Sequence, residues 1–266
     1  MTSTDPAPAI WSGLVGTRAL TRLALRRDRI ALPAAVYVII FAASGAAGKG
    51  IGQLFGTSSA LEREFTRLGG QAAITNAYLA ALMLLAGLVA AAYAISVVLR
   101  LRSEETGDQA ELVLATATGR IRWAVSQLAV AVVGTVLLLA VAGVATGLGY
   151  GLRAGSAGTE VARMTGAAMG QLPSALVLAA LALGLFGLLP RASVPGAWTA
   201  LGVVVVIDLF GQVLQVSHWI LDISPFTHAP RLPGGTVSAE PLLVLCLVAF
   251  ALAAAGLAAL RRRDIA

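Results

Sequence analysis

The chain has 266 residues, of which 58% are hydrophobic and only 12% charged, and its mean hydropathy is +0.85. Because a soluble domain carries about 25% charged residues, the composition excludes an ordinary water-soluble protein and predicts an all-α membrane protein. The formal net charge of +6 is explained by basic residues that face the anionic inner leaflet, so we expect a lipid bilayer and no nucleic acid as partner.

The first predicted element is an amphipathic helix over residues 11–30, which we expect to lie along the inner membrane surface. Arg18, Arg22, Arg26 and Arg29 form one stripe at helical spacing, with apolar residues on the opposite side. Six apolar windows follow, each close to the ~20 residues that a transmembrane helix needs. They predict one transmembrane domain over residues 1–266, with spans at 32–54, 73–99, 122–150, 170–189, 195–214 and 240–260.

The distribution of Lys and Arg predicts the orientation of these spans. With the N-terminus inside, thirteen of the nineteen basic residues fall on the cytoplasmic side. Six spans return the C-terminus to the same side, where Arg261, Arg262 and Arg263 agree with that placement. We therefore expect a multi-pass protein of the cell membrane with both termini in the cytoplasm.

Two connections on the predicted outer side are long. Residues 151–170 are rich in Gly and mixed in charge, and we expect an outer loop there. Residues 215–240 are too polar to span and too long for a turn, which favours an interfacial or re-entrant element between spans five and six. In span three, Gly143, Gly147 and Gly151 recur every four residues and are candidates for close helix packing.

The inner segment between spans two and three reads RSEETGDQAELVLATATGRIRW over residues 102–123. Thr106 and Gln109 form a capping-box pattern, and Gly119 is suited to end a helix. These signals predict a cytoplasmic helix of about three turns over residues 107–118. Such a helix is too short to be stable alone, so it must pack either on the membrane and span ends or on another protein.

The order of residues in this segment resembles the same loop of ABC-2 type transporter permeases. The six spans, the N-terminal amphipathic helix and the terminal RRRDIA extend that resemblance over the chain, which looks most like actinobacterial tetronasin-resistance and other drug-exporter permeases. The resemblance implies that residues 107–118 are a coupling helix for a separate ATP-binding cassette subunit. The positions that carry over are Glu104, Glu105, Gly107, Glu111, Thr116 and Arg120.

The resemblance also implies how the protein assembles and what it moves. Many such permeases join two six-span halves, whereas this sequence has one, so we expect a dimer with a second copy or a paralogue. The substrate expected is a drug, antibiotic, lipid or other amphipathic compound moved by efflux. GAAGKG at residues 45–50 lacks the spacing and the final Ser or Thr of a phosphate loop. We therefore expect no enzyme activity and no cofactor in this chain, with ATP and Mg²⁺ bound by the partner.

Asp208 is the one acidic residue well inside a predicted span. An ionisable group at that depth either has a local partner, such as Gln212 one turn away, or contacts substrate along a pathway. His218, Asp222 and His228 could form an outer metal site, but their irregular spacing favours a structural role, and we expect no metal.

Two other classes of protein remain open at this point. A six-span secondary carrier or channel would need no ATPase, but a proton-coupled carrier needs several ionisable groups at middle depth, and Asp208 stands alone. An intramembrane protease is the weaker alternative. Its paired glutamates lie inside spans, whereas Glu104 and Glu105 belong to a polar stretch where nothing tunes a carboxyl pKa.

Overall fold

A computed structural model describes residues 33–50, 70–105, 120–211, 214–215, 217–236 and 238–262. The chain divides into two units, residues 1–40 and 41–266, and the second holds all the packing discussed below. Every regular element in the described ranges is a helix, and six helical stretches are long and apolar enough to cross a membrane. The predicted all-α membrane fold with six spans is therefore confirmed.

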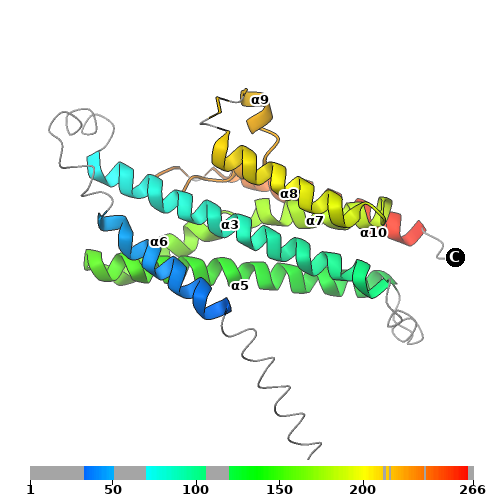
Figure 1. The fold of residues 1–266 in the computed structure, drawn as a ribbon, viewed down its shortest axis with the longest axis horizontal. Coiled ribbons are helices and arrows are strands. Elements are labelled where there is room, and N and C mark those ends of the chain that lie inside the picture. The colour runs from blue at the N-terminus through cyan, green and yellow to red at the C-terminus, as the bar shows by residue number, and fades with distance from the viewer. Residues whose placement is uncertain are drawn as a thin grey trace, which may run out of the picture. The chain divides into compact units, whose positions relative to one another are not determined.

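The described helices follow the chain in the order shown in Figure 1. The first candidate span is Pro33–Gly50. It is followed by α3 (Gly70–Glu105), α5 (Arg120–Ala154), α6 (Ala157–Met169), α7 (Leu172–Leu188), α8 (Ser193–Phe210), α9 (His218–Leu221), the 3₁₀ helix η1 (Pro225–His228) and α10 (Ala239–Arg262).

α7 lies at the centre of the second unit. It is apolar all round, as expected for a helix surrounded by others, and it packs against α3, α8 and α10. Its contact with α10 is close because both helices carry glycine there: a Cβ on Gly187 would lie 2.5 Å from the carbonyl oxygen of Gly256. α10 is buried over only 17% of its apolar window, so most of its surface is free to face lipid or another protein.

Gly143, Gly147 and Gly151, which were predicted as candidates for close helix packing, do pack closely against another helix. A Cβ on Gly143, Gly147 or Gly151 of α5 would lie 2.5 to 2.6 Å from a Cα atom of α6. The partners are Thr165, Val161 and Ala157, which have the same four-residue spacing. The two backbones therefore touch along three turns, and only glycine fits on the α5 side.

Two boundaries differ from the sequence prediction. Most of the expected outer loop 151–170 is helical, because α5 runs on to Ala154 and α6 folds back along it. α3 also extends six residues beyond the predicted end of span two, to Glu105. The added residues, RLRSEE, are mainly strong helix formers, so the helix continues where the apolar sequence stops.

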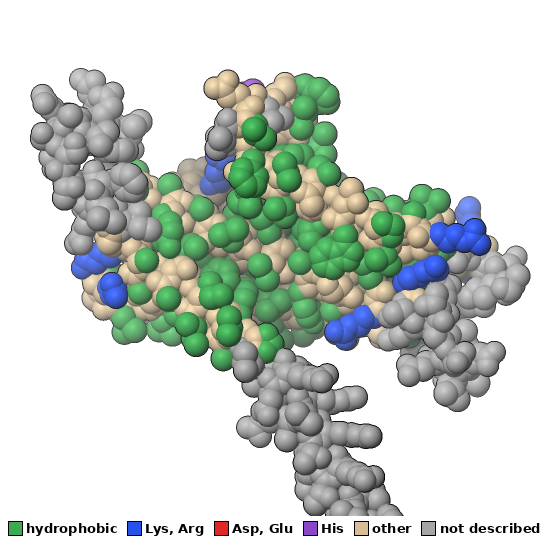
Figure 2. Space-filling view, viewed as in Figure 1, with side chains coloured by type: hydrophobic (Ala, Val, Ile, Leu, Met, Phe, Trp, Pro, Cys, Tyr) green, Lys and Arg blue, Asp and Glu red, His purple; other side chains and the backbone are tan. Residues whose placement is uncertain are grey.

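The surface of the described helices is apolar along its length and basic toward its ends. Figure 2 shows hydrophobic side chains over the middle of one face and Lys and Arg mainly toward the two ends. Exposed apolar residues include Val133 and Leu137 on α5 and Leu247 and Phe250 on α10. This arrangement fits helices that cross a bilayer.

Candidate substrate cavity and coupling segment

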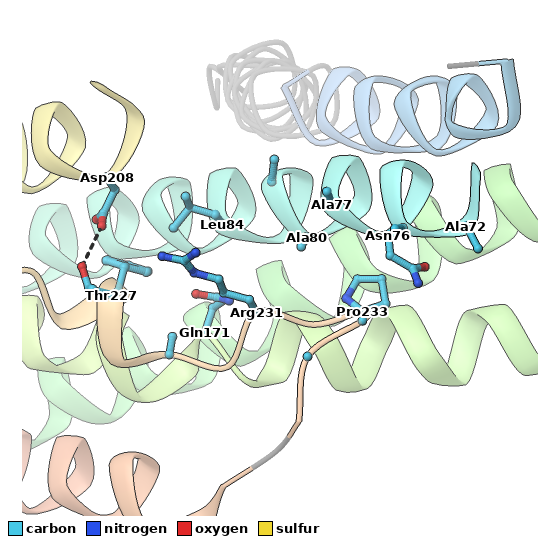
Figure 3. Close-up of a pocket in the computed structure, with 16 residues that line it drawn as sticks. Ala72, Asn76, Ala77, Ala80, Leu84, Gln171, Asp208, Thr227, Arg231 and Pro233 are labelled. Carbon is cyan, nitrogen blue, oxygen red and sulfur yellow. Dashed lines mark hydrogen bonds between the residues drawn. The ribbon is translucent and has the colours of Figure 1, made fainter. Parts of the chain in front are cut away.

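A cavity of about 640 Å³ lies beside the first half of α3. Its other walls come from Gln171 at the junction of α6 and α7, Asp208 on α8, and the segment from Phe226 to Gly235 (Figure 3). Small-molecule sites have volumes of roughly 300–1,000 Å³ and combine apolar walls with a few polar groups. The cavity has the size and composition of such a site.

Apart from Asn76, the α3 wall is apolar and shallow because its side chains are small. Ala72, Ala77 and Ala80 face the cavity along two turns, and Leu84 follows one turn later. Alanine favours helix formation while leaving space that larger side chains would fill. The abundance of alanine in this span therefore produces a smooth apolar surface about 18 Å long.

Asp208 lies in the last turn of α8 and holds the segment opposite. The Ser224 hydroxyl donates to Asp208 Oδ2 at 2.7 Å and accepts from the Phe226 backbone N–H at 3.2 Å. Thr227 Oγ1 lies 3.4 Å from Asp208 Oδ1 but only 2.8 Å from the carbonyl oxygen of Leu221. The Thr227 hydroxyl has one proton, and the shorter distance favours its donation to Leu221. Asp208 therefore anchors the start of η1 through Ser224.

The structure gives Asp208 two partners that the sequence did not suggest. Gln212, the predicted neighbour one turn away, lies outside the described residues. Ser224 and Thr227 are 16 and 19 residues away along the chain, so no helical spacing could have indicated them. Another buried hydroxyl supports the same turn, since Ser174 of α7 donates to the carbonyl oxygen of Pro225 at 2.9 Å.

Gln171 is the cavity residue that sequence reasoning missed. Only 4% of its surface is exposed, and its Oε1 atom has no hydrogen-bond partner among the described residues. It occupies the N-cap of α7, between Gly170 and a helix that starts with Leu172 and Pro173. A polar residue at the start of an apolar helix, two residues before a proline, was the signal available in the sequence.

A second polar cluster ties α6 to α3 at the edge of the cavity. Arg163 Nη2 donates to Asn76 Oδ1 at 2.5 Å, and Arg163 Nη1 forms an ion pair with Glu160 at 3.1 Å. Asn76 itself lines the cavity. This bridge fixes the position of α6 and so of the Gln171 that follows it.

The predicted coupling residues are only partly within the described chain. Glu104 and Glu105 are the last two residues of α3, and Arg120 is the first residue of α5. Gly107, Glu111 and Thr116 fall in 106–119, outside the described residues. The helix expected over 107–118 therefore stays a prediction.

The possible outer metal site gains no support. Among the described residues, no group of three His, Cys, Asp or Glu side chains is arranged to hold a metal ion. His218 and Asp222 lie in and after α9, whereas His228 Nδ1 lies 3.2 Å from the carbonyl oxygen of Ser224. That contact fits the structural role favoured for His228.

Six helical stretches long and apolar enough to cross a membrane, together with a ligand-sized cavity beside α3, define a multi-pass helical membrane protein of the permease class. Residues 18–261 match the model of the family named for the C-terminal domain of the multidrug efflux system permease Rv1217c. The chain belongs to that family, which confirms the resemblance to ABC-2 type drug-exporter permeases.

A curated relative agrees with this assignment. The multidrug efflux system permease protein Rv1217c of Mycobacterium tuberculosis (strain ATCC 25618 / H37Rv) is 41% identical to this chain over 221 residues. The alignment covers 83% of this chain and 40% of that protein, so the chain spans less than half the length of the relative.

Proposed function

We propose that this chain is the membrane-spanning permease of an ATP-binding cassette exporter that moves drugs, antibiotics, lipids or other amphipathic compounds out of the cell. The observation that carries the proposal is 41% identity to a multidrug efflux permease over 83% of the chain. The six apolar helices and the ligand-sized cavity support a role in transport. In this proposal, ATP and Mg²⁺ bind to a partner subunit, and this chain has no enzyme activity.

The segment from Glu104 to Arg120 is the proposed contact with the ATP-binding subunit. α3 ends at Glu105 and α5 begins at Arg120, and these two helices pack against each other. A rigid pair of helices on either side of the segment would carry its movement into the cavity wall, because α3 forms that wall. Glu104, Glu105, Gly107, Glu111, Thr116 and Arg120 are the residues proposed for this contact.

The proposed transport pathway lies between two six-span units, the second being another copy or a paralogue. Exposed apolar residues such as Leu247 and Phe250 offer a surface for it on α10. Asp208 and Gln212 belong to the proposed pathway at the predicted outer end of span five. There Asp208 acts by holding the η1 segment against the cavity.

The test is drug efflux from cells that express the permease with its candidate ATP-binding subunit. We expect the two proteins to co-purify, and efflux to stop when the ATPase loses its catalytic glutamate. Glu111→Lys should leave the amount of permease in the membrane unchanged but impair ATPase binding or uncouple ATP turnover from efflux. The reversed charge opposes both the dipole of the predicted helix and the proposed groove.

Glu240→Lys is the matched control, because Glu240 is an exposed acidic residue in the first turn of α10 and lies outside the coupling segment. It should retain efflux and ATPase binding. Full efflux by Glu111→Lys would show that this residue does not couple. Efflux that persists without a working ATPase would instead identify a secondary carrier or channel.

A further inference from the structure

The amide of Gln171 points to a ligand in the cavity. A buried polar atom without a hydrogen bond costs free energy, so such atoms usually have a protein or water partner. Gln171 lines the cavity, and its buried Oε1 atom has no hydrogen-bond partner among the described residues. This oxygen is a hydrogen-bond acceptor, so a ligand with an N–H or O–H group would supply the donor that it lacks.

Arg231 supplies the charge at the mouth of the same cavity. Its side chain is exposed, and both Arg231 and Gln171 line the cavity (Figure 3). The described residues provide no hydrogen bond or salt bridge to its guanidinium group, although Asp208 is near enough to interact electrostatically. A planar guanidinium with free donors is suited to a carboxylate.

Asp208 is less suited to bind a cationic ligand than Arg231 is to bind a carboxylate. The short bond from Ser224 already occupies one carboxylate oxygen, and the other faces Thr227 (Figure 3). A cation would have to compete with the bond that holds η1 in place. Arg231 therefore favours an anionic group on the ligand, whereas Gln171 Oε1 and Asp208 Oδ1 favour a donor group.

The remaining walls determine the body of the ligand. Ala77, Ala80 and Leu84 present an apolar surface on one side, and Phe226 contributes an aromatic ring. A volume of about 640 Å³ accommodates a drug-sized molecule. An apolar body of two or three rings fits between these walls, with its polar end toward Gln171 and Arg231.

We propose that this cavity is a recognition site for an amphipathic organic acid, whose carboxylate pairs with Arg231 and whose N–H or O–H donates to Gln171 Oε1. The inference rests on the proposed export function and specifies its substrate class. Arg231 then determines the preference for an acid, whereas Gln171 contributes to the affinity of any ligand with a donor.

Three fluorescent probes of one scaffold test the proposal: dansylglycine, its neutral methyl ester and the cationic dansylcadaverine. The full chain, with any ATP-binding subunit that co-purifies, is placed in nanodiscs of neutral phosphatidylcholine and titrated with each probe. We expect dansylglycine to bind about 10-fold more tightly than the ester or the amine, because only its carboxylate forms a charge-assisted hydrogen bond with Arg231.

Two substitutions should separate the roles of the two recognition residues. Arg231→Met should weaken dansylglycine binding about 10-fold and remove the preference for the acid over the ester. Gln171→Met, which keeps the unbranched shape, should weaken both probes by a similar factor, roughly 3- to 10-fold for a neutral hydrogen bond. Arg231→Lys should retain the preference for the acid.

Arg153→Met is the matched control, because Arg153 is exposed on α5 outside the cavity and accepts the Lys49 bond through its backbone oxygen. It should leave all three affinities unchanged. Ala80→Phe fills the cavity from the opposite wall and should weaken dansylglycine without altering either polar residue. It keeps the test decisive if Gln171→Met prevents folding.

The proposal is overturned if the wild-type chain binds no dansylglycine, prefers dansylcadaverine, or binds dansylglycine equally after Arg231→Met and Ala80→Phe. ATP-dependent efflux measured on the same variants distinguishes this failure from that of the proposed function. Unchanged dansylglycine binding in all cavity variants, together with efflux that needs the ATPase, would refute the cavity site alone. Efflux independent of the ATPase would refute the proposed function whatever the cavity binds.

Discussion

At the scale of single residues, Asp208 shows how a charged group is tolerated near the end of an apolar helix. Its carboxylate accepts a 2.7 Å bond from Ser224, and Ser224 in turn caps η1 by accepting from Phe226 N–H. One acidic side chain thus connects α8 to the segment that closes the cavity. Sequence analysis singled out Asp208 but placed it well inside span five, whereas α8 ends at Phe210 and Asp208 lies in its last turn.

We expect Asp208→Leu to destabilise the protein by about 1–3 kcal/mol, because it leaves the buried Ser224 hydroxyl without its acceptor. Asp208→Asn keeps an oxygen at this position and should cost less. Thermal unfolding in nanodiscs measures both changes. Asp222→Leu, at an exposed acidic position after α9, is the control and should have little effect. Equal stability of Asp208→Leu and the wild-type chain would show that the Ser224 bond does not anchor η1.

At the scale of helices, the pairing of α5 with α6 depends on the absence of side chains. Gly143, Gly147 and Gly151 were predicted as packing candidates, and the helix they pack against was expected to be a loop. The sequence of α6 is poor in large apolar residues, so hydropathy gave no sign of it. α6 is stabilised by its contact with α5, and local helix propensity does not include that contact.

The same substitution should have opposite effects at two glycines of this pair. Gly147→Ala places a methyl group 2.5 Å from the Cα atom of Val161 and should destabilise the protein by about 1–3 kcal/mol. Gly166→Ala, on α6, meets nothing within 4 Å and should stabilise it by about 0.5–1 kcal/mol through helix propensity. Thermal unfolding of the two variants checks the pair. Stabilisation by both substitutions would mean that the helices do not touch at Gly147.

At the scale of the whole molecule, the orientation in the membrane follows from the charges and stays a prediction. Among the described basic residues, those on the predicted inner side are Arg100, Arg102, Arg120, Arg122, Arg191, Arg261 and Arg262. The predicted outer side holds Lys49, Arg153, Arg163 and Arg231. If this assignment is correct, the proposed acid-binding cavity opens outward and the coupling segment faces the cytoplasm.

Cysteine labelling tests that orientation in intact cells. Cys246 is the sole cysteine of the sequence, so Cys246→Ser gives a background without thiols. In that background, Ser156→Cys and Ser217→Cys should react with a membrane-impermeant maleimide from outside, because both positions are exposed on the predicted outer side. Ala192→Cys, exposed between α7 and α8, should react only after permeabilisation. The reverse pattern would invert the topology and place the cavity inside.

Apolar length and residue order are local properties of a sequence, so they were enough to predict a six-span helical membrane protein that resembles drug-exporter permeases. The sequence also identified Asp208 and the glycine row of α5, since an isolated charge and a four-residue repeat are visible in one dimension. The folded chain was needed to show that Asp208 bonds to Ser224, that α6 packs on α5, and that Gln171, Asp208 and Arg231 line one cavity. Each of those contacts joins segments whose proximity depends on how the helices pack, and no periodicity along the chain encodes it.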